Sequence, residues 1–275
     1  MVGLKAVEIR NLNYSYSDGT KALNNLSLSI PRYRRVALLG ANGSGKTTLL
    51  QHLNGLLLPQ DGSVTVMGYY PVDKKHVLKI RQLAGMLFDT PEDQLFSTTV
   101  AEDVAFGPRN LELDEQTVNS RVRRAMELAG ITDLADKPPY NLSLGQKKRV
   151  AIAGVLAMEP ELLIFDEPFS GLDPRFAAQL MDLLEKLFHQ KCTIIITTHD
   201  VDMAYAWADH VIILSKGQVL AEGTAELLQD KDLMTEASLN VPMLATAFSG
   251  TDMAPRTPAE ANQLLRFAQR KTKVL

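Results

Sequence analysis

Short runs of apolar and β-branched residues alternate along the chain with longer stretches in which apolar residues recur at helical spacing. This arrangement is typical of an α/β fold with a largely parallel sheet. The runs LLIF and TIIIT lack a regular apolar and polar alternation, which predicts central strands covered on both faces. The expected strands are residues 7–10, 26–30, 36–39, 63–67, 84–88, 162–166, 193–198, 211–214 and 219–222.

Helices are predicted where a capping or turn-forming residue precedes an apolar stripe. They cover residues 46–56, 114–129, 146–158, 174–189 and 201–208. Between Phe88 and Asn141 the pattern becomes helical and polar, which indicates an α-helical subdomain, about residues 89–158, inserted between two parts of the sheet.

After about Asn240 the chain changes character, so we expect residues 1–240 to form the main domain and residues 241–275 a C-terminal extension. Thr257, Pro258 and Glu260 occupy the N-cap, N1 and capping-box positions of one last helix. Its apolar stripe packs either on its own domain or against a second protein. The stripe consists of Ala261, Leu264, Leu265 and Ala268.

Composition narrows the possible functions of this 275-residue chain. Its 29 Lys and Arg residues against 32 Asp and Glu residues give a formal charge of −3, which argues against nucleic-acid binding. No run approaches the ~18 apolar residues of a membrane span, and the N-terminus lacks the apolar block of a secretory signal. We therefore expect a cytosolic protein. The single Cys192 excludes an internal disulfide and a multi-cysteine metal site.

The segment GANGSGKT, residues 40–47, fits the pattern G-x-x-x-x-G-K-[ST] and lies between an apolar strand and a helix-forming run. Its glycines let backbone N–H groups surround anionic oxygens, and the following helix adds its positive end. We expect Lys46 to bridge the β- and γ-phosphates of a nucleotide and Thr47 to ligate Mg²⁺. The expected nucleotide-binding residues here are Gly40, Asn42, Gly43, Ser44, Gly45, Lys46, Thr47 and Thr48.

Two acidic residues end the buried strand LLIF. Asp166 at the strand end is expected to hold Mg²⁺, and Glu167 to act as the general base that activates water. The strand TIIITTHD ends in His199, which either positions the attacking water or is a structural histidine.

A second helix start also suits an anion. Ser143 and Gln146 form an S-x-x-Q capping box, and the Ser143 hydroxyl and the amide of Gly145 lie at that helix N-terminus. One fold can hardly wrap two such sites around one γ-phosphate, so we expect a second protomer to supply this half.

With these motifs in this order, the chain resembles the ATP-binding-cassette (ABC) ATPases, the motor subunits of ABC transporters, over roughly residues 7–228. The matching segments are Walker A (GANGSGKTT), a signature-like LSLGQ, Walker B (LLIFDE), a D-loop at residues 170–173 and the switch His199. The resemblance implies an α/β fold with a P-loop NTPase core, an antiparallel β subdomain and an inserted α-helical subdomain. It also implies that Mg·ATP lies between Walker A of one subunit and Ser143, Gly145 and Gln146 of the other.

The same resemblance implies that Tyr16 stacks on adenine, although a strand tyrosine also packs in this way without a ligand. More narrowly, PEDQLFSTTVAEDVAFGP and KKRVAIAGVLAMEP resemble the energy-coupling-factor branch, whose motors power uptake of vitamins and of cobalt or nickel ions. The chain is most similar to the homodimeric cobalt-type subunit, which implies a peripheral protein on the cytoplasmic face of the cell membrane. Residues 89–106 would dock integral-membrane subunits, with Leu95 and Phe96 as anchors or, alternatively, as core residues of the helical lobe.

Three positions depart from the family pattern. Asp89 replaces the usual Gln that contacts Mg²⁺ and reports to the membrane subunits, and a carboxylate can still meet the ion. Leu144 stands where the signature usually has Gly, which is expected to perturb a γ-phosphate contact. Tyr33 occupies a turn position where Gly is usual, so the turn is expected to differ in shape.

Two other functions compete with the transporter motor. A DNA-repair or chromosome ATPase carries long heptad inserts and a basic track, and neither is present. A regulatory nucleotide-binding module would be consistent with Asp89 and Leu144.

Overall fold

Two sheets form the centre of the protein, for which a computed structural model describes residues 4–272 and the side chains up to residue 267. Within this range, three antiparallel strands have the order β2-β1-β4: β1 (Lys5–Ser15), β2 (Lys21–Pro31) and β4 (Asp61–Val66). The second sheet has the order β5-β6-β7-β3-β8-β9. Its strands are β5 (Ala84–Leu87), β6 (Leu162–Phe165), β7 (Thr193–Thr197), β3 (Arg35–Leu39), β8 (His210–Ser215) and β9 (Gln218–Gly223). All neighbours in it are parallel except β8 and β9.

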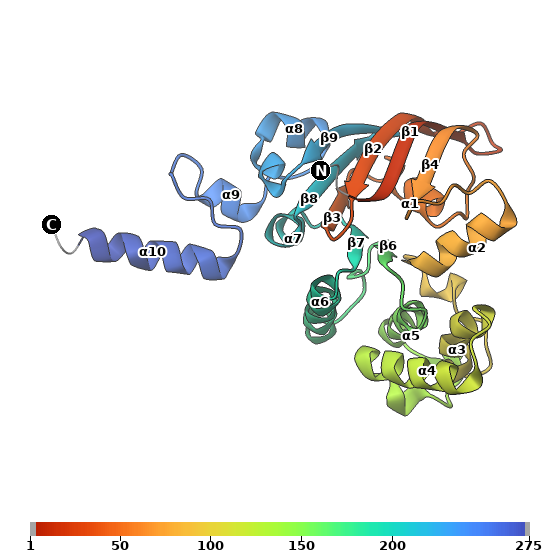
Figure 1. The fold of residues 1–275 in the computed structure, drawn as a ribbon. Coiled ribbons are helices and arrows are strands. Elements are labelled where there is room, and N and C mark those ends of the chain that lie inside the picture. Colours follow the sequence, from red (N-terminus) through yellow and green to blue (C-terminus); the bar gives the residue numbers. More distant parts are fainter. Residues whose placement is uncertain (1–3, 273–275) are drawn as a thin grey trace.

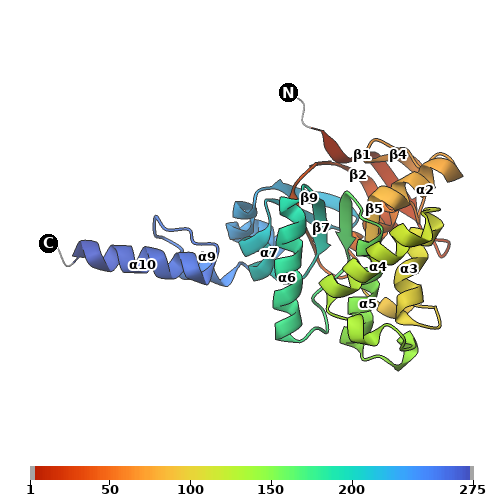
Figure 2. The same ribbon diagram turned by 60° about the horizontal axis from the view of Figure 1, so that its bottom comes forward.

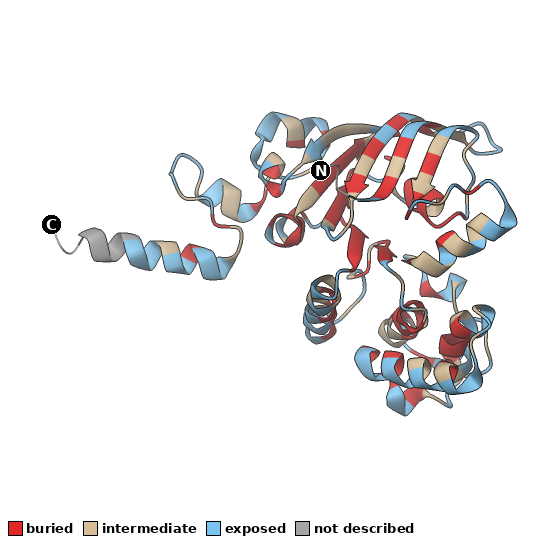
Figure 3. Cartoon of the chain, in the orientation of Figure 1, coloured by how far each residue is buried: buried red, intermediate tan, exposed pale blue. Residues whose placement is uncertain are grey.

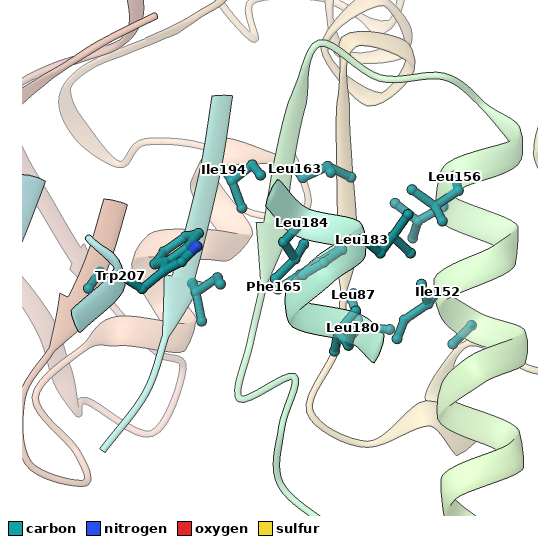
Figure 4. Packing of buried hydrophobic residues seen from close by; sticks show 14 of the residues in the cluster. Leu87, Ile152, Leu156, Leu163, Phe165, Leu180, Leu183, Leu184, Ile194 and Trp207 are labelled. Atoms are coloured by element: carbon teal, nitrogen blue, oxygen red, sulfur yellow. The ribbon is translucent and has the colours of Figure 1, made fainter. Parts of the chain in front are cut away.

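The central strands are buried on both faces, as the runs LLIF and TIIIT predicted. Along β7, Ile194 and Ile196 belong to one apolar cluster, and Ile195 between them belongs to the other. The first cluster packs under helices α5 and α6, and Figure 4 shows Ile152 of α5 and Leu180 of α6 beside Leu87 of β5. The second cluster lies between this sheet and the antiparallel one.

The helices surround these sheets, and Figure 1 shows α3, α4 and α5 grouped apart from the antiparallel strands. Helix α5 packs against both α3 and α4. The bounds are α1 (Lys46–Leu53), α2 (Lys74–Leu83), α3 (Val100–Asn110), α4 (Glu115–Ala129), α5 (Leu144–Ala157), α6 (Pro174–His189), α7 (Val201–Trp207), α8 (Lys231–Glu236), α9 (Met243–Ala247) and α10 (Pro258–Thr272). Short 3-10 turns are η1 (Pro91–Asp93), η2 (Thr132–Leu134), η3 (Pro139–Asn141) and η4 (Ala225–Gln229).

Each predicted strand and helix corresponds to an observed one, but β1 and β2 are longer than expected. Asn11 and Asn25 lie just outside the predicted strands, and both adopt positive φ angles, near 50°. The register of β1 with β2 shifts beside Asn11, so these strands continue through irregularities instead of ending. Helix α2 was not predicted, because Ile80 is its only buried residue and its stripe is too narrow to be recognised.

The C-terminal extension is fastened to helix α7. The backbone N–H of Met243 donates to the Asp202 carboxylate (2.6 Å), and the Arg256 guanidinium donates to the carbonyls of Tyr205 (2.6 Å) and Ala208 (2.5 Å). Beyond Arg256, helix α10 extends away from the body in both views (Figures 1 and 2).

The helix α10 begins as predicted, with the N–H of Glu260 donating to the Thr257 hydroxyl. The Glu260 carboxylate accepts from the N–H of Arg256, not from that of Thr257, so the capping box is incomplete. Of the predicted stripe, Ala261 is buried, Leu264 is half-buried and Leu265 is exposed, while the side chain of Ala268 lies outside the described residues (Figure 3).

Cys192 lies at the start of β7, where it is buried. Burial raises the pKa of its thiol to about 12. The thiol is therefore protonated and poorly nucleophilic at neutral pH.

The turn before β3 holds Tyr33 in a backbone conformation that glycine adopts more readily. Tyr33 has a φ of 61°, in the left-handed region, and its backbone N–H donates to the Thr193 hydroxyl. Tyrosine therefore adopts a strained conformation here, and the expected change of turn shape stays a prediction. Such a φ costs a non-glycine residue about 1–2 kcal/mol.

We expect Tyr33→Gly to raise the melting temperature by roughly 1–4 °C, because relief of this strain exceeds the added freedom of the unfolded chain. Scanning calorimetry measures the change. Tyr70→Gly is the control, because Tyr70 is equally exposed but is not among the residues with positive φ. A lower melting temperature for Tyr33→Gly would show that its ring contributes more than its backbone costs.

Candidate functional site

The loop between β3 and α1 is closely packed against its surroundings. Gly40 has a φ of 146°, and a Cβ there would lie 2.3 Å from the carbonyl oxygen of Leu214. Gly45 has a φ of 102°, and a Cβ there would lie 2.7 Å from the carbonyl oxygen of Ala22. Only glycine satisfies both conditions, so these two residues fix the course of the loop.

The side chains of this loop are arranged for an anionic ligand. Lys46 is half-buried, and its Nζ donates to the carbonyls of Gly40 (2.7 Å) and Ala41 (3.2 Å). Burial lowers the pKa of Lys46, while the charges of Glu167 and Asp166 oppose this effect. The buried hydroxyl of Ser44 has no hydrogen-bond partner among the described residues, as expected of a group that completes its bonding with a ligand.

A chain of hydrogen bonds joins this loop to the ends of β6 and β7. The Thr47 hydroxyl donates to Asp166 Oδ2 (2.7 Å), and the Thr197 hydroxyl donates to Asp166 Oδ1 (2.5 Å). The backbone N–H of Glu167 donates to the same Thr197 hydroxyl (2.9 Å). Thr197 was not predicted as a site residue. Its signal in the sequence was a threonine at the carboxyl end of a strand whose interior is aliphatic.

Glu167 itself is held in an unusual conformation. Its φ is 44°, a left-handed value that costs a glutamate about 1–3 kcal/mol. Its Oε2 lies 3.1 Å from Nδ1 of His199, whose side chain is 79 % exposed. Burial raises the pKa of Glu167, and the hydrogen bond to His199 opposes this shift. The two predicted catalytic residues therefore lie side by side at the mouth of the loop.

Tyr16 lies against the start of helix α1. Its hydroxyl is 2.9 Å from the Thr48 hydroxyl, and its ring packs edge-on against Tyr14, with 5.3 Å between the ring centroids. The ring remains 38 % exposed. It can therefore present a face to a planar ligand next to the loop.

The segment after β5 carries the third predicted metal ligand. Asp89 is exposed there, between β5 and η1. Gln94 holds this segment against the end of β5 through two hydrogen bonds. Its side-chain N–H donates to the carbonyl of Met86 (3.0 Å), and its side-chain oxygen accepts from the N–H of Phe88 (2.8 Å). Sequence reasoning gave Gln94 no such role.

The signature segment lies at the N-terminus of α5. Its capping box is present: the Ser143 hydroxyl accepts from the N–H of Gln146 (3.4 Å), and Gln146 Oε1 accepts from the N–H of Ser143 (3.0 Å). Leu144 is 51 % exposed, and its Cδ2 would lie 3.1 Å from a Cβ on Gly171. Leu144 thus reaches the predicted D-loop of its own chain.

The donor set suits Mg²⁺, a hard cation that prefers oxygen ligands. Thr47 and Asp166 supply a hydroxyl and a carboxylate that already lie in contact. The described part of the chain contains no cluster of three or more His, Cys, Asp or Glu side chains able to hold a metal ion. An ion bound by Thr47 and Asp166 would therefore need further oxygen ligands, from Asp89, water or phosphate.

A cavity of about 960 Å³ separates α2 from the α3–α5 group. Its wall includes Gln94, Phe96 and Phe106, and the two phenylalanine rings pack edge to face, with 4.7 Å between their centroids. Phe96 is 65 % exposed, whereas Leu95 is half-buried against the core. The core alternative is thus confirmed for Leu95 and not for Phe96, and the anchor role stays a prediction. None of the described helices combines the length and apolarity that a membrane crossing requires.

Comparison with known proteins agrees with this geometry. The profile of the ABC transporter family matches residues 23–170. The energy-coupling factor transporter ATP-binding protein EcfA of Carboxydothermus hydrogenoformans is 44% identical over 264 residues, covering 95% of this chain and 97% of that protein. EcfA of Methanosphaera stadtmanae is 45% identical over 248 residues, covering 90% and 89%.

Solved structures give the same result. CbiO1 of Clostridium perfringens, described as part of the ABC transporter complex cbiONQ, has a TM-score of 0.72 and 41% identity, covering 89% of this chain and 98% of that one. The dimeric ATP-binding cassette MJ0796 bound to ADP and Pi has a TM-score of 0.73 and 28% identity, covering 80% and 98%. The chain therefore belongs to the ABC transporter family and is an ABC ATPase of the energy-coupling factor type.

Proposed function

We propose that this chain is the motor subunit of an energy-coupling factor importer that takes up cobalt or nickel ions. Two copies close head to tail on two Mg·ATP molecules, and hydrolysis reopens them to move integral-membrane subunits. The network of Thr47, Asp166, Thr197, Glu167 and His199 carries the proposal, because it couples the phosphate loop to a carboxylate placed to accept a proton from water. The cobalt-type cargo is supported by the likeness to CbiO1.

In this proposal each protomer binds ATP through its own loop. Lys46 and the loop N–H groups neutralise the phosphate oxygens, and Tyr16 stacks on the adenine. Thr47, Asp166 and Asp89 would hold Mg²⁺, which would neutralise charge on the phosphates. Glu167 accepts a proton from the attacking water, and His199 keeps the Glu167 carboxylate and that water oriented.

The second half of the site comes from the other copy, through Ser143, Gly145 and Gln146. The surroundings of Gly145 support a contribution from the other copy. It is absent from the residues with positive φ, and a Cβ there would meet no described atom within 4 Å. Neither the backbone nor the packing of its own chain requires glycine at this position, whereas close approach of a nucleotide bound to another chain does.

ATP turnover of the purified chain, measured with and without candidate membrane subunits, tests the motor function. Turnover that requires ATP and Mg²⁺ and changes when the membrane subunits are added is expected. A chain that binds ATP but does not hydrolyse it in either condition would instead be a regulatory module.

The membrane subunits are proposed to dock near residues 89–106, at the cavity beside α2, which makes the chain a peripheral protein of the cytoplasmic membrane face. An exposed aromatic pair suits a partner helix with an apolar face. We expect Phe96→Ser to reduce co-purification of the membrane subunits at least tenfold and to leave the basal ATPase rate within about twofold.

A pull-down with the tagged chain measures this retention. Leu128→Ser is the matched control, because Leu128 is exposed on α4 and does not line this cavity. Retention of the partners by Phe96→Ser to the same extent as by Leu128→Ser would contradict this docking site.

A further inference from the structure

A buried lysine joins the signature helix to the backbone of Glu167. Lys148, on the second turn of α5, is only 2% exposed. Its Nζ donates to the carbonyl of Glu167 (2.8 Å) and to the carbonyl of Ser170 (3.0 Å). Burying an ammonium group is costly, so a lysine is retained at such a position only where its hydrogen bonds compensate.

The local charges also favour the ammonium form. Burial lowers the pKa of Lys148, and the negative charges of Asp89, Glu167 and Asp166 oppose this effect. Its two hydrogen bonds make Lys148 a donor to the turn that carries Glu167.

The two bonds bear directly on the strained residue of the site. Glu167 has its N–H held by Thr197 of β7 and its carbonyl held by Lys148 of α5. Both polar groups of its backbone are thereby fixed by side chains, which compensates for the left-handed φ of 44°. The Glu167 carbonyl also accepts from the backbone N–H of Ser170 (3.2 Å). Without Lys148, that longer bond within the turn alone would hold the carbonyl, and we expect the peptide to relax and to move the carboxylate that lies beside His199.

We propose that Lys148 is a positioning residue for ATP hydrolysis. It ties the carbonyls of Glu167 and of Ser170, in the predicted D-loop, to helix α5, whose N-cap is Ser143. The inference rests on the proposed role of Glu167 as general base. In this arrangement, a shift of α5 is transmitted to Glu167 through one side chain.

The neighbouring lysine provides a matched control. Lys147 is also a lysine of α5, but its Nζ pairs with the Glu92 carboxylate (2.8 Å), and Glu92 is exposed at the surface. Both residues belong to the same helix turn, so helix propensity and formal charge change equally when either is replaced.

We expect Lys148→Met to lower kcat for ATP hydrolysis about 10- to 100-fold, while the KM and the Kd for ATP stay within about twofold. Methionine keeps most of the volume and removes the donors. Lys148→Gln, which retains an N–H donor, should restore part of kcat, and Lys147→Met should stay within about twofold of the wild type. Scanning calorimetry and titration of the ATP-binding sites give the folded fraction of each variant, and each rate is divided by that fraction.

A double-variant cycle separates this role from a general structural one. If Lys148 acts through Glu167, Lys148→Met should lower the residual rate of Glu167→Gln by less than about twofold. The inference would be overturned if the double variant lost kcat by the product of the two single-variant factors. A wild-type kcat for folded Lys148→Met would overturn it as well. Should the methionine variant not fold, Lys148→Gln carries the same cycle. A wild-type rate for Glu167→Gln alone would instead overturn the proposed function.

Discussion

Replacing Glu167 with glutamine is expected to lower kcat for ATP hydrolysis by about 10²–10⁴-fold and to leave the Kd for ATP within about twofold. The amide cannot accept the proton of the attacking water. ATP binding survives because the phosphate contacts belong to the loop at residues 40–48, and glutamine preserves the shape of the side chain that faces His199. The closed dimer with bound ATP should therefore accumulate.

Steady-state turnover and equilibrium ATP binding measure these two effects separately. Glu161→Gln is the control. Glu161 immediately precedes β6, whereas Glu167 follows the other end of that strand, and the carboxylate of Glu161 pairs with Arg32 at the surface. Hydrolysis at the wild-type rate by Glu167→Gln would show that another group activates the water.

The second large effect concerns assembly. In the Glu167→Gln background, Ser143→Arg should abolish the ATP-dependent dimer while each protomer still binds one ATP. Ser143 is exposed, and its side chain and backbone bond only to its own helix turn among the contacts of the described residues. Arginine there would obstruct the nucleotide of the opposite copy, and loss of the cap costs only about 1 kcal/mol.

Size-exclusion chromatography with light scattering, with and without Mg·ATP, measures the dimer. Ser120→Arg, an exposed substitution on α4, is the control and should dimerise like the Glu167→Gln parent. A Ser143→Arg double variant that dimerises equally well would contradict a site shared between two copies.

Much of the fold was predictable because several local signals coincide in it. The runs LLIF and TIIIT predicted strands covered on both faces, and both apolar clusters contain their residues. The phosphate loop was recognisable because chain geometry at Gly40 and Gly45 tolerates only glycine. A strict steric requirement leaves a clear pattern in a single sequence.

The remaining features depend on contacts that sequence spacing does not record. Lys148 is indistinguishable from Lys147 in the sequence. The packing of α5 on the Glu167 turn buries Lys148, whereas Lys147 is half-buried and pairs with the surface residue Glu92. Tyr33 stands at a turn that holds it at a positive φ, which its residue type does not indicate. In both cases tertiary structure overrides the ordinary preference of the residue type.

The protonated, buried thiol of Cys192 has a practical consequence for measuring the motion of this motor. Because this is the chain's single cysteine and its pKa is near 12, maleimide reagents should modify it slowly at neutral pH. A new cysteine at an exposed position such as Leu265 could then carry a spin label or a fluorophore in the otherwise natural sequence. Distances between the labels of two copies would report opening and closing directly.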